Sequence, residues 1–107
     1  MITVNFYKNK RNVVRIESFG HAEYDDFGKD IICAAVSILI INCANSIEQF
    51  TDDLIDSNIH EDGTTEILLK ESISHDSVLL IDSLKLGLDG IVSTYGKKYL
   101  KISVKEV

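Results

Sequence analysis

The stretch GHAEYDDFGKDIICAAVS, residues 20–37, begins where a predicted strand ends and finishes inside the most apolar predicted helix of the chain. Its first half is polar and bounded by Gly20 and Gly28, which is typical of a surface loop. Asp30 stands at the change from polar to apolar residues, where an aspartate can accept backbone N–H bonds as a helix cap. The stretch therefore predicts a loop-to-helix junction, and we expect the other elements to form around it.

Strands and helices on both sides of this junction follow from the period of the apolar residues. Alternation of apolar and polar residues predicts strands, and apolar residues recurring every three or four positions predict helices. Asp62-Gly63 indicates a tight turn between two strands, and Ser74 can cap the second helix. The predicted elements are strands at residues 2–8 and 12–19, a helix at 30–50, strands starting near 54 and 65, a helix at 75–94 and a last strand from 100. This order, ββαββαβ, predicts an α+β fold in a single domain, a mixed β-sheet with two helices packed on it.

The two predicted helices differ in the distribution of their apolar residues. Apolar side chains cover most of the circumference at 30–50, which predicts that this helix is buried in the middle of the domain. The helix at 75–94 carries one apolar stripe and two glycines, Gly87 and Gly90, each costing about 1 kcal/mol relative to alanine. We interpret these glycines as places where a neighbouring element, or a second copy of the chain, approaches closely.

Length and charge limit the classes of function. The chain has 107 residues, which suits one domain, and a formal net charge of −6 at pH 7. A nucleic-acid binder needs a basic patch, so this charge argues against direct nucleic-acid binding and is compatible with a basic partner or substrate. The N-terminus lacks the pattern of a signal peptide, and the apolar run from Ile31 to Ile41 is shorter than the roughly 20 residues that span a bilayer. We expect a cytoplasmic protein without membrane association.

Two cysteines, Cys33 and Cys43, fall in the helix predicted at 30–50. A rise of ~1.5 Å per residue separates them by roughly 15 Å, which is too far for a disulfide, so we expect two free thiols. Cys33 lies in the first turn, where the helix dipole and unpaired N–H groups favour a thiolate. Cys43 lies mid-helix and is expected to be structural. The simpler interpretation of Cys33 is also a small buried hydrophobe, and a catalytic role requires a base nearby.

His21 is the candidate base. It follows the end of a predicted strand, and the loop from Ala22 to Lys29 can fold back to bring its imidazole beside Cys33, although a solvated loop histidine is the simpler interpretation. Asp30 either caps the helix or orients the imidazole. Ser37 lies one turn after Cys33 and either bonds the helix backbone or supports the thiol.

Carboxylates gather in the same loop at Glu23, Asp25 and Asp26. Because no second histidine or cysteine stands at ligand spacing, we interpret the cluster as solvated and predict no metal site. The sequence has no Gly-rich phosphate loop, so no cofactor is predicted.

The residues of the opening stretch resemble a known signature. Gly20-His21-Ala22, a short loop to Gly28, and the run from Asp30 to Ser37 resemble the motif of the ribosomal-processing cysteine protease family Prp, also called YsxB-like. Where that motif has valine, this chain has Ile32, a conservative change. The length of the chain, its Met-Ile-Thr-Val start and its element order are similar to the family as well.

The resemblance implies a function. It assigns His21 and Cys33 as a catalytic dyad, with supporting roles for Asp30 and Ser37. The loop residues that would then face the substrate are Gly20, Ala22, Tyr24, Phe27 and Gly28. It further implies a homodimer that removes a short N-terminal extension from large-subunit ribosomal protein twenty-seven, cutting after an aromatic residue and before alanine. The mechanism would be acyl transfer, with backbone N–H groups at the helix start stabilising the oxyanion.

Two other functions stay open at this point. A non-enzymatic, ribosome-associated binding module with a structural Cys33 would have an inert thiol. A redox sensor would need a resolving cysteine, for which Cys43 is too distant.

The loop from Ala22 to Lys29 has little apolar content, which predicts low local stability. We expect it to be mobile without substrate, with His21 beyond hydrogen-bond reach of Cys33. Tyr24 or Phe27 would contact the substrate and order the loop.

Overall fold

The order of strands and helices is the predicted one. The computed structural model describes residues 1–25 and 30–107. The elements in these ranges are β1 (Ile2–Lys8), β2 (Val13–Gly20), α1 (Ile31–Phe50), β3 (Ile55–Ile59), β4 (Thr65–Leu69), α2 (His75–Tyr95) and β5 (Leu100–Glu106). The order ββαββαβ and the α+β fold class are therefore confirmed, and the predicted boundaries differ from the observed ones by one or two residues at most elements.

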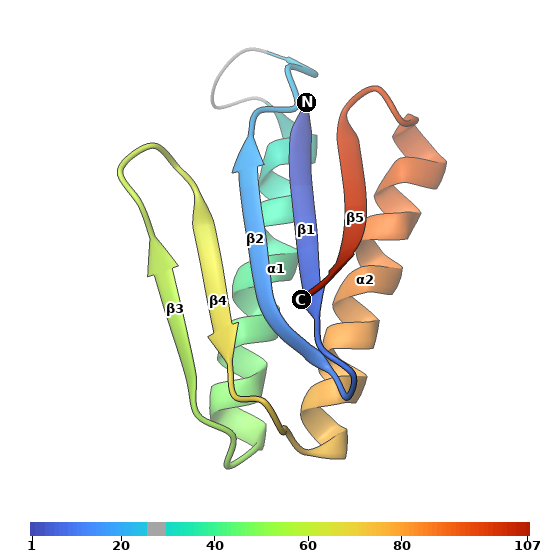
Figure 1. Cartoon of the computed structure of the whole chain (residues 1–107). Coiled ribbons are helices and arrows are strands. Elements are labelled where there is room, and N and C mark those ends of the chain that lie inside the picture. The colour runs from blue at the N-terminus through green and yellow to red at the C-terminus, as the bar shows by residue number, and fades with distance from the viewer. Residues whose placement is uncertain (26–29) are drawn as a thin grey trace.

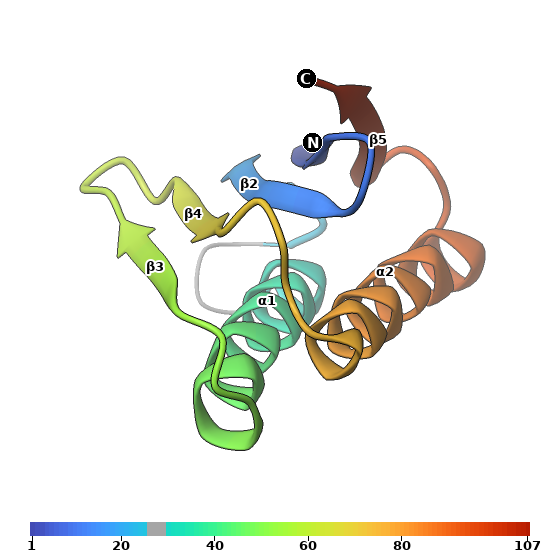
Figure 2. The ribbon, with the colours of Figure 1, turned by 60° about the horizontal axis from the view of Figure 1, so that its bottom comes forward.

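The strands form one mixed sheet in the order β3-β4-β2-β1-β5. β1 pairs antiparallel with β2 and parallel with β5, so the last strand of the chain lies beside the first. α2 forms the crossover from β4 to β5, which lie on opposite sides of β2 and β1 in the sheet. Both helices lie on the same face of the sheet (Figures 1 and 2). The sheet therefore has one face covered by helices and one open face.

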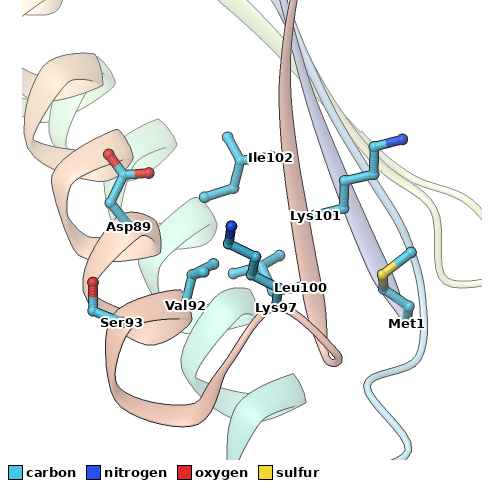
Figure 3. Close-up of a pocket in the computed structure, with 8 residues that line it drawn as sticks. All are labelled: Met1, Asp89, Val92, Ser93, Lys97, Leu100, Lys101 and Ile102. Atoms are coloured by element: carbon cyan, nitrogen blue, oxygen red, sulfur yellow. The ribbon is translucent and has the colours of Figure 1, made fainter.

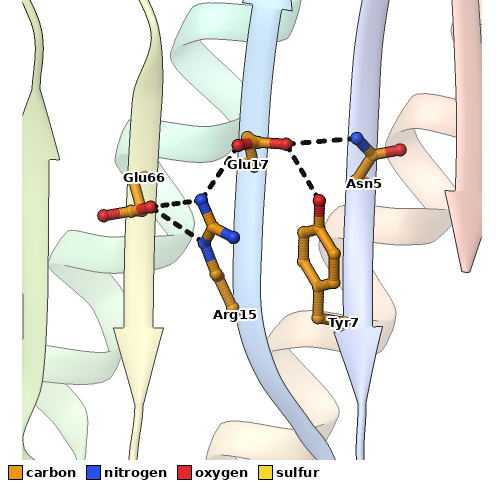
Figure 4. Close-up of polar contacts among 5 residues, drawn as sticks. All are labelled: Asn5, Tyr7, Arg15, Glu17 and Glu66. Atoms are coloured by element: carbon orange, nitrogen blue, oxygen red, sulfur yellow. Dashed lines mark hydrogen bonds and ion pairs between the residues drawn. The ribbon is translucent and has the colours of Figure 1, made fainter. Parts of the chain in front are cut away.

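The alternation that predicts β1 separates these two faces. Ile2, Val4 and Phe6 are at most 4% exposed and belong to the core between the sheet and the helices. On the open face, polar side chains of β1, β2 and β4 bond to one another (Figure 4). Glu17 accepts hydrogen bonds from Asn5 at 3.2 Å, Tyr7 at 3.1 Å and Arg15 at 2.9 Å, and Arg15 also bonds Glu66 at 2.8 Å. These bonds satisfy polar groups that neighbouring side chains partly shield from water.

The prediction that α1 is buried all round is wrong. Its core-facing residues are Ile32, Val36, Ile40, Cys43, Ala44 and Ile47. On its opposite side Ile38 is 67% exposed, and Phe50, the last residue of the helix, is 73% exposed. The reason is the two-layer architecture: helices that cover one face of a sheet have nothing behind them within a single chain. By length and composition alone α1 could cross a membrane, a test that core helices of soluble proteins also pass.

The interpretation of Gly87 as a close-approach site is confirmed within the chain. A Cβ built on Gly87 would lie 3.1 Å from Cδ1 of Leu39, so the glycine lets α2 pack closely on α1. Gly90 has nothing within 4 Å of a built Cβ. Gly87 therefore supports the helix pair rather than a contact between two chains.

Candidate active site

The N-terminus of α1 is capped by Asp30, as one of the two hypotheses predicts. Its Oδ1 accepts hydrogen bonds from the backbone N–H groups of Ile32 at 3.0 Å and Cys33 at 3.1 Å. Its Oδ2 accepts the N–H of Tyr24 at 3.0 Å, which ties the preceding segment to the helix. Partial desolvation opposes ionisation, but these N–H bonds outweigh it and hold the pKa of the Asp30 carboxyl below its usual range. Within residues 1–25 and 30–107, no hydrogen bond joins Asp30 to His21.

The thiol of Cys33 lies in the first turn of α1 and is half-buried. Its Sγ accepts a hydrogen bond from the backbone N–H of Ala22 at 3.3 Å. Ala22 itself is 3% exposed, so its backbone is held in place by the packing of its methyl group. The Gly20-His21-Ala22 motif therefore delivers a backbone donor to the sulfur as well as a histidine.

Burial, hydrogen bonds and neighbouring charges act on the pKa of the Cys33 thiol. Burial raises its pKa, and the neighbouring Asp30 carboxylate raises it further. The Ala22 N–H stabilises the thiolate and lowers the pKa, but the net result is a pKa above the ordinary value. The thiol of the free protein is therefore protonated at neutral pH and needs a base to become a nucleophile.

His21, Cys33 and Ser37 come together at the walls of two cavities. The first encloses about 480 Å³ and is also lined by the carboxylates Glu23, Asp25 and Asp30. The second encloses about 320 Å³ and extends toward the tip of the β3–β4 hairpin. Its other lining residues are Ile2, Ser18, Phe19, Gly20, Val36, Ile40, Ile41, Ile59, Gly63 and Thr65. The candidate residues thus stand where an acidic cavity meets a largely apolar one.

The imidazole of His21 is exposed. Among the described residues, the Cys33 thiol has hydrogen-bond partners in Ala22 and Asp30 and none in His21. This agrees with the expectation that the pair is apart in the free protein. Gly20 has φ +91°, and a Cβ there would collide with the carbonyl oxygen of Met1. The Gly20 position therefore requires glycine, which explains its place before His21. Residues 26–29, which include Phe27 and Gly28, lie outside the described residues. The mobility predicted for this part of the loop therefore stays a prediction.

A third cavity, of about 440 Å³, lies between α2 and β5 (Figure 3). Its lining residues are Met1, Asp89, Val92, Ser93, Lys97, Leu100, Lys101 and Ile102. It has no cysteine or histidine, so it offers no counterpart to the thiol and imidazole of the first two cavities. Within residues 1–25 and 30–107, no group of three or more histidine, cysteine, aspartate or glutamate side chains is placed to hold a metal ion.

Comparison with known proteins decides between the open interpretations. The family model described as cysteine protease Prp matches residues 1–101. The chain belongs to the Prp family of cysteine proteases. A curated relative, the ribosomal processing cysteine protease Prp of Staphylococcus aureus, is 26% identical over 99 residues, which cover 91% of this chain and 93% of the relative.

Solved structures agree with this assignment. A crystal structure of the S. aureus ribosomal processing protease Prp with a covalently linked product peptide superposes with a TM-score of 0.89 at 25% identity, covering 98% of this chain and all of that one. A crystal structure from Streptococcus mutans gives a TM-score of 0.82 at 26% identity, covering 100% of this chain and 96% of that one. Membership of the Prp family makes the chain a cysteine protease and sets aside the binding-module and redox-sensor hypotheses.

Several features of this Prp-family site are not evident from the sequence pattern. The Ala22 N–H bond to Cys33 depends on how the loop folds back, and no residue type signals it. The prediction that backbone N–H groups at the helix start are available to stabilise the oxyanion is wrong in part. The N–H groups of Ile32 and Cys33 are occupied by Asp30 Oδ1, and that of Ala34 bonds the Asp30 carbonyl at 3.2 Å. An aspartate cap of this kind satisfies the donors that would otherwise be free.

Proposed function

We propose that this Prp-family protease removes the N-terminal extension of large-subunit ribosomal protein twenty-seven in the cytoplasm, with Cys33 as nucleophile and His21 as general base and acid. The observation that carries the proposal is the position of the Cys33 sulfur. It lies at the start of α1, accepts the Ala22 N–H at 3.3 Å, and borders a cavity that His21 also lines. The other cysteine of the chain, Cys43, is 3% exposed, which is unsuited to attack on a peptide.

The proposed reaction is acyl transfer in two steps. With substrate bound, His21 takes the proton from Cys33, and the thiolate attacks the carbonyl carbon of the scissile peptide bond. The protonated imidazole then donates that proton to the leaving amine, which departs as the new N-terminus and leaves a thioester on Cys33. A water molecule, deprotonated by His21, hydrolyses the thioester and restores the thiol.

The N–H of Ala22 is the backbone donor that best suits the oxyanion of this reaction. In the free protein it stabilises sulfur, and it lies on the same side of Cys33 as the imidazole-bearing segment. Attack would transfer negative charge from the sulfur to the carbonyl oxygen of the substrate. An N–H group that already lies beside the sulfur can then donate a hydrogen bond to that oxygen. Asp30 would act by capping α1 and holding Tyr24, and Ser37 would contact the peptide from the helix face that lines both cavities.

Charge around the site favours a basic substrate. Glu23, Asp25 and Asp30 line the first cavity, and the whole chain carries a formal charge of −6. Ribosomal proteins are basic because they bind RNA, so attraction would raise the rate of encounter with this surface. The second cavity, lined by Ile40, Ile41 and other apolar side chains, offers apolar contacts for residues on one side of the cut.

We further propose that the protease works as a homodimer. Gly87 packs against Leu39 of the same chain and so gives no support for a dimer. The support comes from apolar side chains on the exposed side of the helix layer. There Ile38 is 67% exposed, Leu79 59% and Leu86 73%, and a second copy would cover such side chains. Sedimentation at micromolar concentration should give a dimer, and Leu86→Asp should shift the chain toward monomer. A wild-type chain that sediments as a monomer would contradict the dimer.

The function is tested by incubating the purified protein with ribosomal protein twenty-seven that carries its N-terminal extension. Mass spectrometry should show the shortened protein with the wild type and intact substrate with Cys33→Ala or His21→Ala. Cys43→Ala is the matched control and should cleave like the wild type. Intact substrate after prolonged incubation with the folded wild type would refute the proposed substrate.

A further inference from the structure

Three tyrosine rings meet beside the candidate active site. Tyr24 belongs to the segment that follows His21, Tyr95 is the last residue of α2, and Tyr99 directly precedes β5. The Tyr24 ring makes edge-to-face contacts with both others, with centroids 5.6 Å from Tyr95 and 5.2 Å from Tyr99. Such geometry is the favoured one for aromatic pairs. The segment that carries His21 is thus fastened to the far end of the chain.

Tyr99 is the fixed part of this cluster. Its side chain packs against the hydrophobic core, and its carbonyl oxygen accepts the N–H of Ile2 at 2.9 Å. Tyr95 and Tyr24 are more exposed, at 38% and 41%. Tyr24 therefore rests on a support that the folded domain holds in place, and its removal opens no hole in the core.

Between the cluster and the sulfur, the backbone adopts a conformation that a side chain disfavours. Glu23 has φ +57°, and among the described residues it is the non-glycine residue with positive φ. Contacts hold this turn on both sides. Before it, the Ala22 methyl is buried and the Ala22 N–H bonds Cys33 Sγ; after it, the Tyr24 N–H bonds Asp30. A strained turn persists only when its surroundings impose it.

We propose that Tyr95 and Tyr99 are positioning residues of the active site: by holding the Tyr24 ring they maintain the turn at Glu23, and the turn keeps the Ala22 N–H on the Cys33 sulfur. The inference rests on the proposed role of Cys33. Neither tyrosine touches the thiol; each acts through Tyr24. Loss of the support relaxes the turn, moves the Ala22 donor away and leaves the thiolate without its hydrogen bond. The proton affinity of the thiol then rises, and the reactive fraction falls.

The test is the rate of Cys33 alkylation by iodoacetamide as a function of pH, followed by mass spectrometry of the Cys33 peptide. Tyr24→Ala and Tyr95→Ala should shift the profile to higher pH and slow alkylation at neutral pH by about threefold to tenfold, because a thiolate fraction falls tenfold per unit of pKa. The double variant Tyr24→Ala/Tyr95→Ala should be no slower than the slower single variant, since both act through one contact.

Conservative and distant variants separate positioning from general destabilisation. Tyr24→Phe and Tyr95→Phe keep the rings and should restore the wild-type profile. Tyr7→Ala removes a tyrosine from the open face of the sheet and should leave the profile unchanged. Tyr95→Leu keeps apolar bulk without an aromatic ring and should shift the alkylation profile. It replaces Tyr24→Ala in the test if that variant does not fold.

An unchanged profile in the folded Tyr24→Ala or Tyr95→Leu protein would overturn the inference, as would additive effects in the double variant. Alkylation requires no peptide, so a wild type that fails to cleave the ribosomal protein would count against the proposed function and leave this measurement intact.

Discussion

Cys33 and Cys43 are the same residue type on the same helix, yet they differ in exposure, in bordering cavities and in hydrogen-bond partners. Cys33 is half-buried in the first turn of α1, borders two cavities and accepts the Ala22 N–H. Cys43 is 3% exposed between α1 and α2, with its sulfur 3.7 Å from the Leu80 carbonyl oxygen. Burial raises the pKa of Cys43 to about 11. The comparison predicts that position along the helix, relative to its capped end and to the second helix, decides which thiol can react.

The two thiols also share a property, because both have a pKa above the ordinary value. For Cys43 burial alone is responsible, and no described group stabilises its thiolate. For Cys33 the Ala22 N–H opposes burial and the Asp30 carboxylate. Where opposing influences act on a thiol, small movements of one donor or one charge can shift its pKa. The pKa of a thiol in a uniformly apolar site cannot be shifted in this way.

The largest difference between the thiols should appear in catalysis. Cys33→Ala should reduce cleavage of the ribosomal substrate by at least about 10³-fold, the scale expected for loss of a nucleophile. Cys43→Ala should retain activity within about twofold, because its side chain touches neither cavity. Rates from the mass-spectrometric cleavage assay test both variants. Comparable losses in the two would remove the functional distinction.

Direct labelling should show the next largest difference. In the native protein near pH 8, iodoacetamide should alkylate Cys33 at least about tenfold faster than Cys43, and in denaturant the two rates should converge. Because the pKa of Cys33 is raised, its rate should continue to climb above about pH 8.5, the ordinary thiol pKa. Quantitative mass spectrometry of the two peptides gives both profiles. Equal native rates would mean that the cavities do not expose the sulfur.

The Asp30 charge should affect the pKa of Cys33 and leave that of Cys43 unchanged. Asn caps helices as well as Asp, so Asp30→Asn should keep α1 stable while removing a charge that raises the Cys33 pKa. Alkylation of Cys33 at neutral pH should accelerate severalfold, with Cys43 unchanged. If Asp30 instead orients His21, the same variant should sharply reduce cleavage, so alkylation and cleavage measured together distinguish the two roles.

Asp30→Ala should remove the cap as well and cost about 1 kcal/mol of stability, measured by denaturant unfolding. The pH dependence has a definite sign. The Asp30 pKa is lowered by folding, so its contribution is present above the unfolded value of about 4 and disappears as the pH falls through the lower folded value. The wild type should therefore lose more stability than Asp30→Ala on acidification below about pH 4. Parallel losses would show that the cap does not depend on the carboxylate.

The smallest effect belongs to the structural thiol. Cys43→Ala leaves a small void between α1 and α2 and should lower the free energy of unfolding by about 1 kcal/mol. The pH profile of Cys33 alkylation should stay unchanged, since the two sulfurs share no partner. A shift in that profile would show that packing between the helices is coupled to the active site.

Local patterns in the sequence were sufficient to predict the strands and helices and the protease family. Alternation at Ile2, Val4 and Phe6 marks a strand with one buried face, because side chains on a strand point to opposite sides in turn. Asp30 and Ser74 begin their helices where predicted, because caps act on N–H groups only two or three residues away. The Gly-His-Ala and Asp-Ile-Ile-Cys segments indicated the protease family, since catalysis requires particular residue types at particular spacings.

Tertiary structure alone decided how these elements face one another. The apolar pattern of α1 predicts burial on all sides, but a helix layer on one face of a sheet leaves Ile38 exposed. The Ala22 N–H reaches Cys33, and Tyr24 reaches Tyr95 and Tyr99, across 11 to 75 residues of chain. Periodicity and capping report interactions within a few residues. The tyrosine contacts arise because β5 returns beside β1 and brings the end of α2 to the segment that follows His21.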